Sequence, residues 1–146
     1  MKTAEMILKE AGYYQGRNVD ISQTMDMYSK YGYHINDVQK RIITEYAYLI
    51  VSYMHPFWKQ EIIIRFSPVE AQKAITMEVV ELYNSYFNDE WAIIGDIEKE
   101  NMTIFISKDG VYYTAFDDYI IEWGSDILKM IDKLIKGECG NTYIIE

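Results

Sequence analysis

Apolar side chains at helical spacing predict three helices in the N-terminal third of the chain. The first helix ends at Gly12, because glycine readily adopts the left-handed conformation that closes many helices. Its apolar face consists of Ala4, Ile7, Leu8 and Ala11. Asp20 or Ser22 caps a second helix, which Gly32 closes. Asn36 caps a third helix, whose apolar face consists of Val38, Ile42 and Tyr46.

Apolar runs rich in β-branched residues then predict a series of strands. The turn that begins at His55-Pro56 joins the first two strands as a hairpin. Asp109-Gly110 joins two later strands, because an Asp-Gly step between apolar runs is a strong hairpin signal. The predicted strands cover residues 49–54, 61–66, 91–97, 102–107, 111–116 and 119–123.

Two further helices are predicted, one between these strands and one after them. Ser67-Pro68 begins the first of these, since proline fits the first turn of a helix. Its apolar face consists of Ile75, Val79, Leu82, Tyr83 and Tyr86. Gly124-Ser125 caps the other helix, and Gly137 ends it. Its apolar residues are Ile127, Leu128, Ile131, Leu134 and Ile135. Consecutive hairpins imply a mainly antiparallel sheet with helices packed against it, so the predicted fold class is α+β.

Charge is distributed unevenly along the chain. The formal net charge is −9, and residues 89–126 alone contribute −8, with ten acidic residues against two lysines. A field of this sign repels phosphate backbones and attracts basic partners, so we expect no nucleic-acid ligand. The alternative is that the acidic surface only keeps the protein soluble.

The chain shows no sign of export or membrane insertion. Glu5, Lys9 and Glu10 interrupt the N-terminal stretch where a signal peptide needs apolar residues. The longest uncharged apolar run, residues 47–54, is too short to cross a bilayer. The single cysteine, Cys139, excludes an intramolecular disulfide. We therefore expect a soluble cytoplasmic protein with no membrane partner.

No motif for enzymatic chemistry stands out. The chain lacks a Gly-rich phosphate loop, a Cys-x-x-Cys pair and a His-Glu-x-x-His metal motif, so we expect no cofactor and no metal site. His34 and His55 are interpreted as packed or partly exposed loop histidines, and Cys139 lacks a scaffold that activates it. Asp117-Asp118 lies at a strand junction and is interpreted as a solvated turn. We expect no enzyme and no catalytic residue; a carboxylate-based enzyme is a remaining alternative.

Tyrosines accompany the acidic residues. Strand alternation sends Tyr112 and Tyr113 to opposite faces of the sheet, so at most one of them is expected in the core. Tyr119, Trp91 and Trp123 lie in the same part of the chain. Tyrosine beside carboxylates suits an interface for Lys- or Arg-rich partners. The alternative is that these side chains only cover the sheet.

Several short motifs occur in a fixed order and spacing. They are Ala11-Gly12-Tyr13, Gly16-Arg17, Val19-Asp20-Ile21, Ile94-Gly95, Asp109-Gly110-Val111-Tyr112 and Trp123-Gly124-Ser125. Together they resemble the third subfamily of the SUKH superfamily of bacterial immunity proteins, from about Ala4 to Gly137. The chain departs from the family's pattern at three places. The family usually has tryptophan where this chain has Tyr13, and a Gly-Gly pair where it has Ala47-Tyr48. It commonly has proline where this chain has Ile93.

The resemblance implies a single SUKH-like domain over residues 1–146, with its core at 4–137. It also implies a cognate inhibitor of a secreted or contact-delivered bacterial toxin, as in polymorphic toxin systems and contact-dependent inhibition. Nucleases are prominent among such toxins, and an acidic inhibitor suits their basic clefts. The residues we expect to bind the toxin are Glu98, Glu100, Asp117, Asp118 and Tyr119. The alternative is a general interaction or regulatory module with an endogenous partner.

The motif residues themselves are expected to be structural. Arg17 is predicted to pair with a carboxylate or to bond backbone carbonyls across the joint after the first helix. The other residues assigned structural roles are Gly12, Tyr13, Gly16, Gly95, Gly110 and Gly124.

Overall fold

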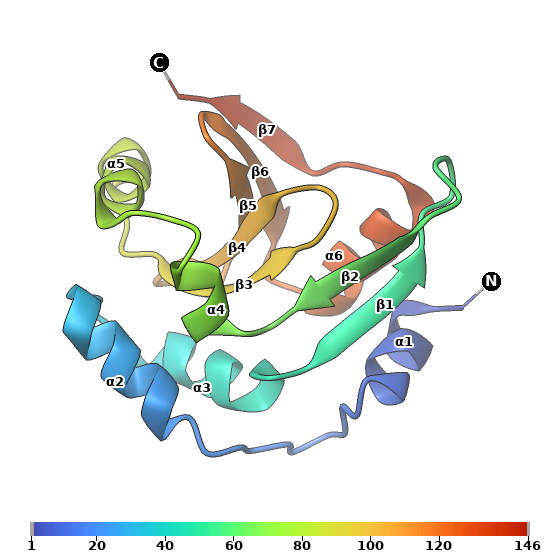
Figure 1. The fold of residues 1–146 in the computed structure, drawn as a ribbon, viewed down its shortest axis with the longest axis horizontal. Coiled ribbons are helices and arrows are strands. Elements are labelled where there is room, and N and C mark those ends of the chain that lie inside the picture. Colours follow the sequence, from blue (N-terminus) through green and yellow to red (C-terminus); the bar gives the residue numbers. More distant parts are fainter. Residues whose placement is uncertain (1, 146) are drawn as a thin grey trace.

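A computed structural model describes residues 2–145, so Met1 and Glu146, at the ends of the predicted domain, lie outside the described residues. Its strands form one seven-stranded open sheet in the order β1-β2-β3-β4-β5-β6-β7, with every neighbouring pair antiparallel (Figure 1). The strands are β1 Ile50–Met54, β2 Glu61–Arg65, β3 Ala92–Ile97, β4 Met102–Ile106, β5 Tyr112–Phe116, β6 Tyr119–Gly124 and β7 Asn141–Ile144. The helices are α1 Ala4–Glu10, α2 Ser22–Tyr31, α3 Asp37–Tyr46, α4 Pro68–Gln72, α5 Met77–Phe87 and α6 Ile127–Lys136.

The α+β prediction is confirmed, and the structure differs from it in two elements. The helix predicted after Pro68 is divided into α4 and α5, because Thr76 adopts an extended backbone that starts a new helix (φ −95°, ψ 156°). The last strand, β7, was not predicted. Its residues Thr142-Tyr143-Ile144, followed by Ile145, are a short run of β-favouring side chains that the prediction did not use, and the strand pairs with β6.

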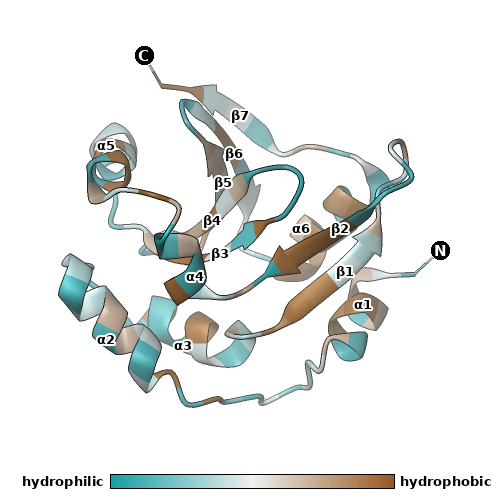
Figure 2. Cartoon of the chain, viewed as in Figure 1, coloured by the Kyte–Doolittle hydropathy of each residue, from teal (hydrophilic) through white to brown (hydrophobic). Residues whose placement is uncertain are grey.

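Helices cover the two faces of the sheet unequally. On one face, which we call the α5 face, Tyr83 and Phe87 pack against Phe105 and Tyr113, with ring centroids 5.7 and 5.2 Å apart respectively. Thr114 points to the opposite face, since side chains alternate along a strand. That second face, the α6 face, is covered in part by α6 and α1. Figure 2 shows hydrophobic residues along β1 and β2 and mostly hydrophilic residues on α2.

Both neighbouring tyrosines of β5 are buried, so the expectation that at most one lies in the core is wrong. Tyr112 is 2% exposed and Tyr113 is 7% exposed. At this end of β5 both sheet faces are covered, and a register irregularity between the two residues accompanies the pairing with β6. Trp91 and Trp123 are buried as well. These aromatic side chains therefore build the core, and at most 7% of each is exposed.

Several predicted caps and faces shift by one or two residues. In α3 the buried positions are Gln39 and Ile43, whereas Val38 is exposed. Gln39 tolerates burial because its amide nitrogen donates to backbone oxygens of Glu90 (2.8 Å) and Ile106 (3.1 Å).

On α5, the predicted face members Leu82 and Tyr86 are exposed. The side chain that caps α6 is Asp126, not Gly124-Ser125. The N-cap residue of α2 is Ile21, which makes no side-chain cap, but the Asp20 carboxylate accepts a hydrogen bond from the amide of Ser22, the first residue of that helix (2.9 Å). The Asn36 cap of α3 is confirmed.

The segment after α1 is fastened to the C-terminal end of α3. Tyr13 stacks on Tyr46 at 5.1 Å and donates its hydroxyl hydrogen to the Glu45 carboxylate. Arg17 Nη1 donates to the backbone oxygen of Glu45 at 2.7 Å. That oxygen belongs to the last turn of the helix, where carbonyls lack helical partners and a cation is favoured. The joint thus connects the N-terminal helix to α3.

Gly95 lies on β3 directly against the backbone at the end of β2. A Cβ atom at this position would overlap the backbone oxygen of Arg65, so no side chain fits without moving β2. The ladder between β3 and β4 shifts its register between Ile93 and Gly95. The four other glycines assigned structural roles have positive φ: Gly12, Gly16, Gly110 and Gly124.

Candidate functional site

Three connections gather at one end of the sheet, which we call the loop edge. They are the β1–β2 hairpin (55–60), the β3–β4 loop (98–101) and the β5–β6 turn (117–118). The Glu98 amide donates to Ile63 O at 2.8 Å, which ties the loop to β2. All five predicted toxin-binding residues lie at this edge: Glu98, Glu100, Asp117, Asp118 and Tyr119. The structure thus brings them to one end of the sheet but distributes them over its two faces.

The β5–β6 turn presents its carboxylates on a fixed backbone. Asp117 and Asp118 are both exposed, and Asp117 has a left-handed backbone with φ 52°. The Tyr83 hydroxyl donates to Asp117 O at 2.6 Å, and the Ile145 amide donates to Asp118 O at 2.9 Å. Burial, with the negative charges of both aspartates, raises the pKa of Tyr83 to about 12. The turn is therefore held from both sides while its side chains face solvent.

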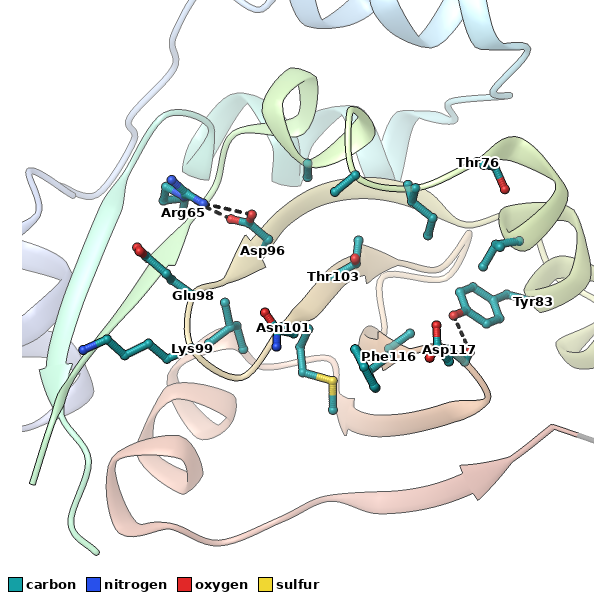
Figure 3. A pocket seen from close by; sticks show the side chains of 17 residues that line it. Arg65, Thr76, Tyr83, Asp96, Glu98, Lys99, Asn101, Thr103, Phe116 and Asp117 are labelled. Atoms are coloured by element: carbon teal, nitrogen blue, oxygen red, sulfur yellow. Dashed lines mark hydrogen bonds and ion pairs between the residues drawn. The ribbon is translucent and has the colours of Figure 1, made fainter. Parts of the chain in front are cut away.

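A groove of about 480 Å³ runs between the α5 face of the sheet and helices α4 and α5. We call it the charged groove. The Arg65–Asp96 pair, at 3.1–3.2 Å, lies at one end, and Tyr83 with Asp117 lies at the other (Figure 3). Glu98 also lines it. The hydrogen bond to Asp96, with the charges of Asp96 and Glu98, raises the pKa of Arg65, so part of the acidity is neutralised internally.

A second groove, of about 320 Å³, lies on the α6 face at the same edge. We call it the aromatic groove. Its lining residues include Trp58, Glu100, Thr114, Ile121, Trp123 and Leu134. Burial raises the pKa of Glu100, and the nearby His55 partly offsets this shift. Glu98 and Glu100, two positions apart in one loop, therefore lie in different grooves.

The β1–β2 hairpin supplies the wall of the aromatic groove. His55 is buried, and its Nδ1 accepts hydrogen bonds from the amides of Phe57 and Trp58, both at 3.2 Å. The His55 ring stacks on Trp58 at 3.9 Å, while Trp58 is 52% exposed. His55 is thus the packed loop histidine that the sequence indicated. Trp58 was not considered as a surface residue, although its position in a predicted turn was a usable signal.

An apolar strip lies at the loop edge, on the sheet face that strand alternation assigns to the α6 side, and its member Phe116 also lines the charged groove (Figure 3). Phe116 (48% exposed), Tyr119 (36%) and Ile144 (61%) are direct cross-strand neighbours on β5, β6 and β7. Of the three, only Tyr119 was predicted to bind a partner. Alternation from the buried Ala115 could have placed Phe116 on this face, but Ile144 required the unpredicted β7.

Other kinds of site find little support in the described part of the chain. Within residues 2–145, no group of three or more His, Cys, Asp or Glu side chains could hold a metal ion. No helix among these residues is long and apolar enough to cross a membrane. His34 and Cys139 are exposed and lie outside both grooves.

The fold and the loop edge define an α+β protein whose exposed carboxylates and aromatic side chains suit the recognition of another protein. The sequence model of the SUKH-3 immunity protein family matches residues 1–137, so the chain belongs to this family and the resemblance is confirmed. Membership supports an immunity role in general, with a toxin protein as the partner. Such immunity proteins are generally not enzymes. Comparison with curated proteins and with solved structures gave no match.

Proposed function

We propose that this protein binds a cognate toxin domain directly through its loop edge and thereby blocks the toxin. The observation that carries the proposal is the gathering of Glu98, Glu100, Asp117 and Asp118 at one end of the sheet. These carboxylates come from two connections that are held by backbone hydrogen bonds, so the surface is largely preformed. A preformed surface loses little conformational entropy on binding.

The charge of the loop edge indicates the chemistry of the partner. Carboxylates attract a basic surface and accelerate association with it. A nuclease is basic where it holds phosphates, so the proposed toxin is a nuclease whose cleft the acidic edge occupies. The protein acts as a non-enzymatic inhibitor in the cytoplasm of the producing cell, and it acts as a single domain.

Co-expression tests this function. The toxin domain encoded beside this gene is induced with and without the protein, and surviving cells are counted. We expect rescue, together with a stable complex of the purified proteins on a sizing column. Failure to rescue, with both proteins folded and expressed, would contradict inhibition of this toxin.

Charge reversal tests the surface. The double variant Asp117→Lys/Asp118→Lys should weaken the complex by roughly 30-fold or more at low salt, since it removes attraction and adds repulsion. The matched control is Glu78→Lys/Glu81→Lys, which reverses two exposed carboxylates on α5. Unchanged binding by the first variant, or equal loss by both, would place the interface elsewhere.

A further inference from the structure

The aromatic groove and the apolar strip are neighbours on β5 and β6 at the loop edge, and Phe116 of the strip also borders the charged groove. Thr114 and Ile121 line the groove, and they pair directly across β5 and β6 in the row next to Phe116 and Tyr119. Trp58 closes the groove on the side of the hairpin. Tryptophan and tyrosine at such a site are the residue types that dominate binding energy in protein interfaces.

Glu100 is the one carboxylate in this groove, and it lacks a partner. The three ion pairs within residues 2–145 are Lys2–Glu10, Arg65–Asp96 and Lys73–Glu70, so neither Glu100 nor Lys99, which also lines the groove, has an ion partner. Glu100 is half-buried, which weakens its hydration. The hydroxyl of Tyr53, near enough for Glu100 to raise its pKa, is buried without a hydrogen-bond partner.

We propose that the aromatic groove receives an arginine or lysine side chain of the toxin, which pairs with Glu100 while the apolar strip covers the surrounding toxin surface. This inference rests on the proposed function and assigns the specific contact within it. A toxin cation beside the carboxylate supplies the ion pair that Glu100 does not form with Lys99. The exposed face of Trp58 offers the aromatic surface on which a guanidinium stacks, and this favours arginine.

The apolar strip extends beyond the part of the chain that matches the family. The family match ends at residue 137, whereas Ile144, the most exposed member of the strip, lies beyond it on β7. The frame of the groove therefore comes from the part of the chain that matches the family. The outer rim comes from a segment outside that match.

Binding measurements on single variants test this proposal. The dissociation constant for the purified toxin domain encoded beside this gene is measured by calorimetry for the wild-type protein, Glu100→Gln and Phe116→Ala. We expect Glu100→Gln to weaken binding by about 30-fold or more and Phe116→Ala by about tenfold. Glu81→Gln removes one exposed carboxylate from α5, and Leu82→Ala truncates an equally exposed apolar residue there (50%), so both serve as matched controls that should stay within about threefold.

Glu98→Gln distinguishes a specific contact of Glu100 with the toxin from the general electrostatic attraction of the acidic edge. It removes the same charge two residues away, in the charged groove, and should weaken binding by only about threefold. Wild-type binding with equal losses for Glu98→Gln and Glu100→Gln would overturn the groove contact and leave the proposed function standing. Absence of binding by the wild-type protein would overturn both. Normal folding of each variant is checked by its thermal transition.

Discussion

The charged groove and the aromatic groove lie at the same end of one sheet and differ in how their carboxylates are satisfied. In the charged groove, Asp96 accepts two hydrogen bonds from Arg65, and Glu98 lies close enough to add to the stabilisation of that guanidinium. In the aromatic groove, Glu100 is half-buried without an ion pair. Equal formal charges therefore do not have equal capacity to bind a partner, and net charge alone does not locate an interface.

The largest effect is expected at Gly95 on β3, the strand that leads into the loop carrying Glu98 and Glu100. Gly95→Ala places a methyl group against the backbone oxygen of Arg65, so β2 and β3 must separate and the Arg65–Asp96 pair beside them moves. We expect a loss of about 3 kcal/mol or more in the free energy of unfolding, measured by urea denaturation. Gly16→Ala, with open space around its Cβ position but positive φ, should cost only about 1 kcal/mol. Equal costs for the two variants would refute the steric explanation.

A smaller loss is expected at the N-terminal joint, away from both grooves. Arg17→Ala removes the hydrogen bond from a charged side chain to Glu45 O and should lower the free energy of unfolding by about 1.5–3 kcal/mol. Toxin affinity should be unchanged below the melting transition. Arg41→Ala, at an exposed position on α3, is the control for loss of a cation. Unchanged stability with lost toxin binding would make Arg17 a binding residue.

The ion pair of the charged groove should contribute little to stability. The Arg65 and Asp96 side chains are 41% and 28% exposed, so solvent screens their attraction. Arg65→Met should change the free energy of unfolding by less than about 1 kcal/mol. The same variant exposes an uncompensated Asp96, so association with a basic toxin should become faster at low salt, as measured by stopped flow. Slower association would indicate that Arg65 itself contacts the toxin.

Glu100→Gln should raise the free energy of unfolding of the free protein, whereas the glycine and Arg17 variants lower it. Burial raises the pKa of Glu100 above its ordinary value of 4.5, so the folded protein holds this proton more tightly than the unfolded chain does. Stability therefore falls as the pH rises through 4.5 and the raised pKa. The variant should melt at a higher temperature than wild type at neutral pH and at the same temperature well below pH 4.5. A variant that melts lower at neutral pH would show that the ionised carboxylate has a stabilising partner.

Local pattern was enough to predict most of the fold. Apolar runs located six of the strands, and Asn36 and Gly137 marked helix ends where the structure has them. The strand β7 was missed although Thr142-Tyr143-Ile144 carries a short strand signal, and its pairing with β6 appears only in the fold. Likewise, the burial of both Tyr112 and Tyr113 depends on helices that cover both faces of β5.

The sequence predicted which segment of the chain carries the candidate site, but not that its carboxylates lie on two different faces of the sheet. Counting charges pointed to residues 89–126, and the loop edge gathers carboxylates from that range. The side on which Glu98 or Glu100 lies depends on the path of a loop in which Lys99 and Asn101 have positive φ. The environment of Glu100 depends on His55 and Trp58, which are distant in sequence. Only the three-dimensional arrangement separates the two grooves.

Hydrogen exchange of the backbone amides, with and without the toxin domain, tests the central claim most directly. Direct binding at the loop edge predicts slower exchange in residues 55–60, 98–101 and 116–119 of the complex. Exchange in α2, remote from this edge, should be unchanged. Protection confined to α2 and α3, with the loop edge exchanging as in the free protein, would contradict the account.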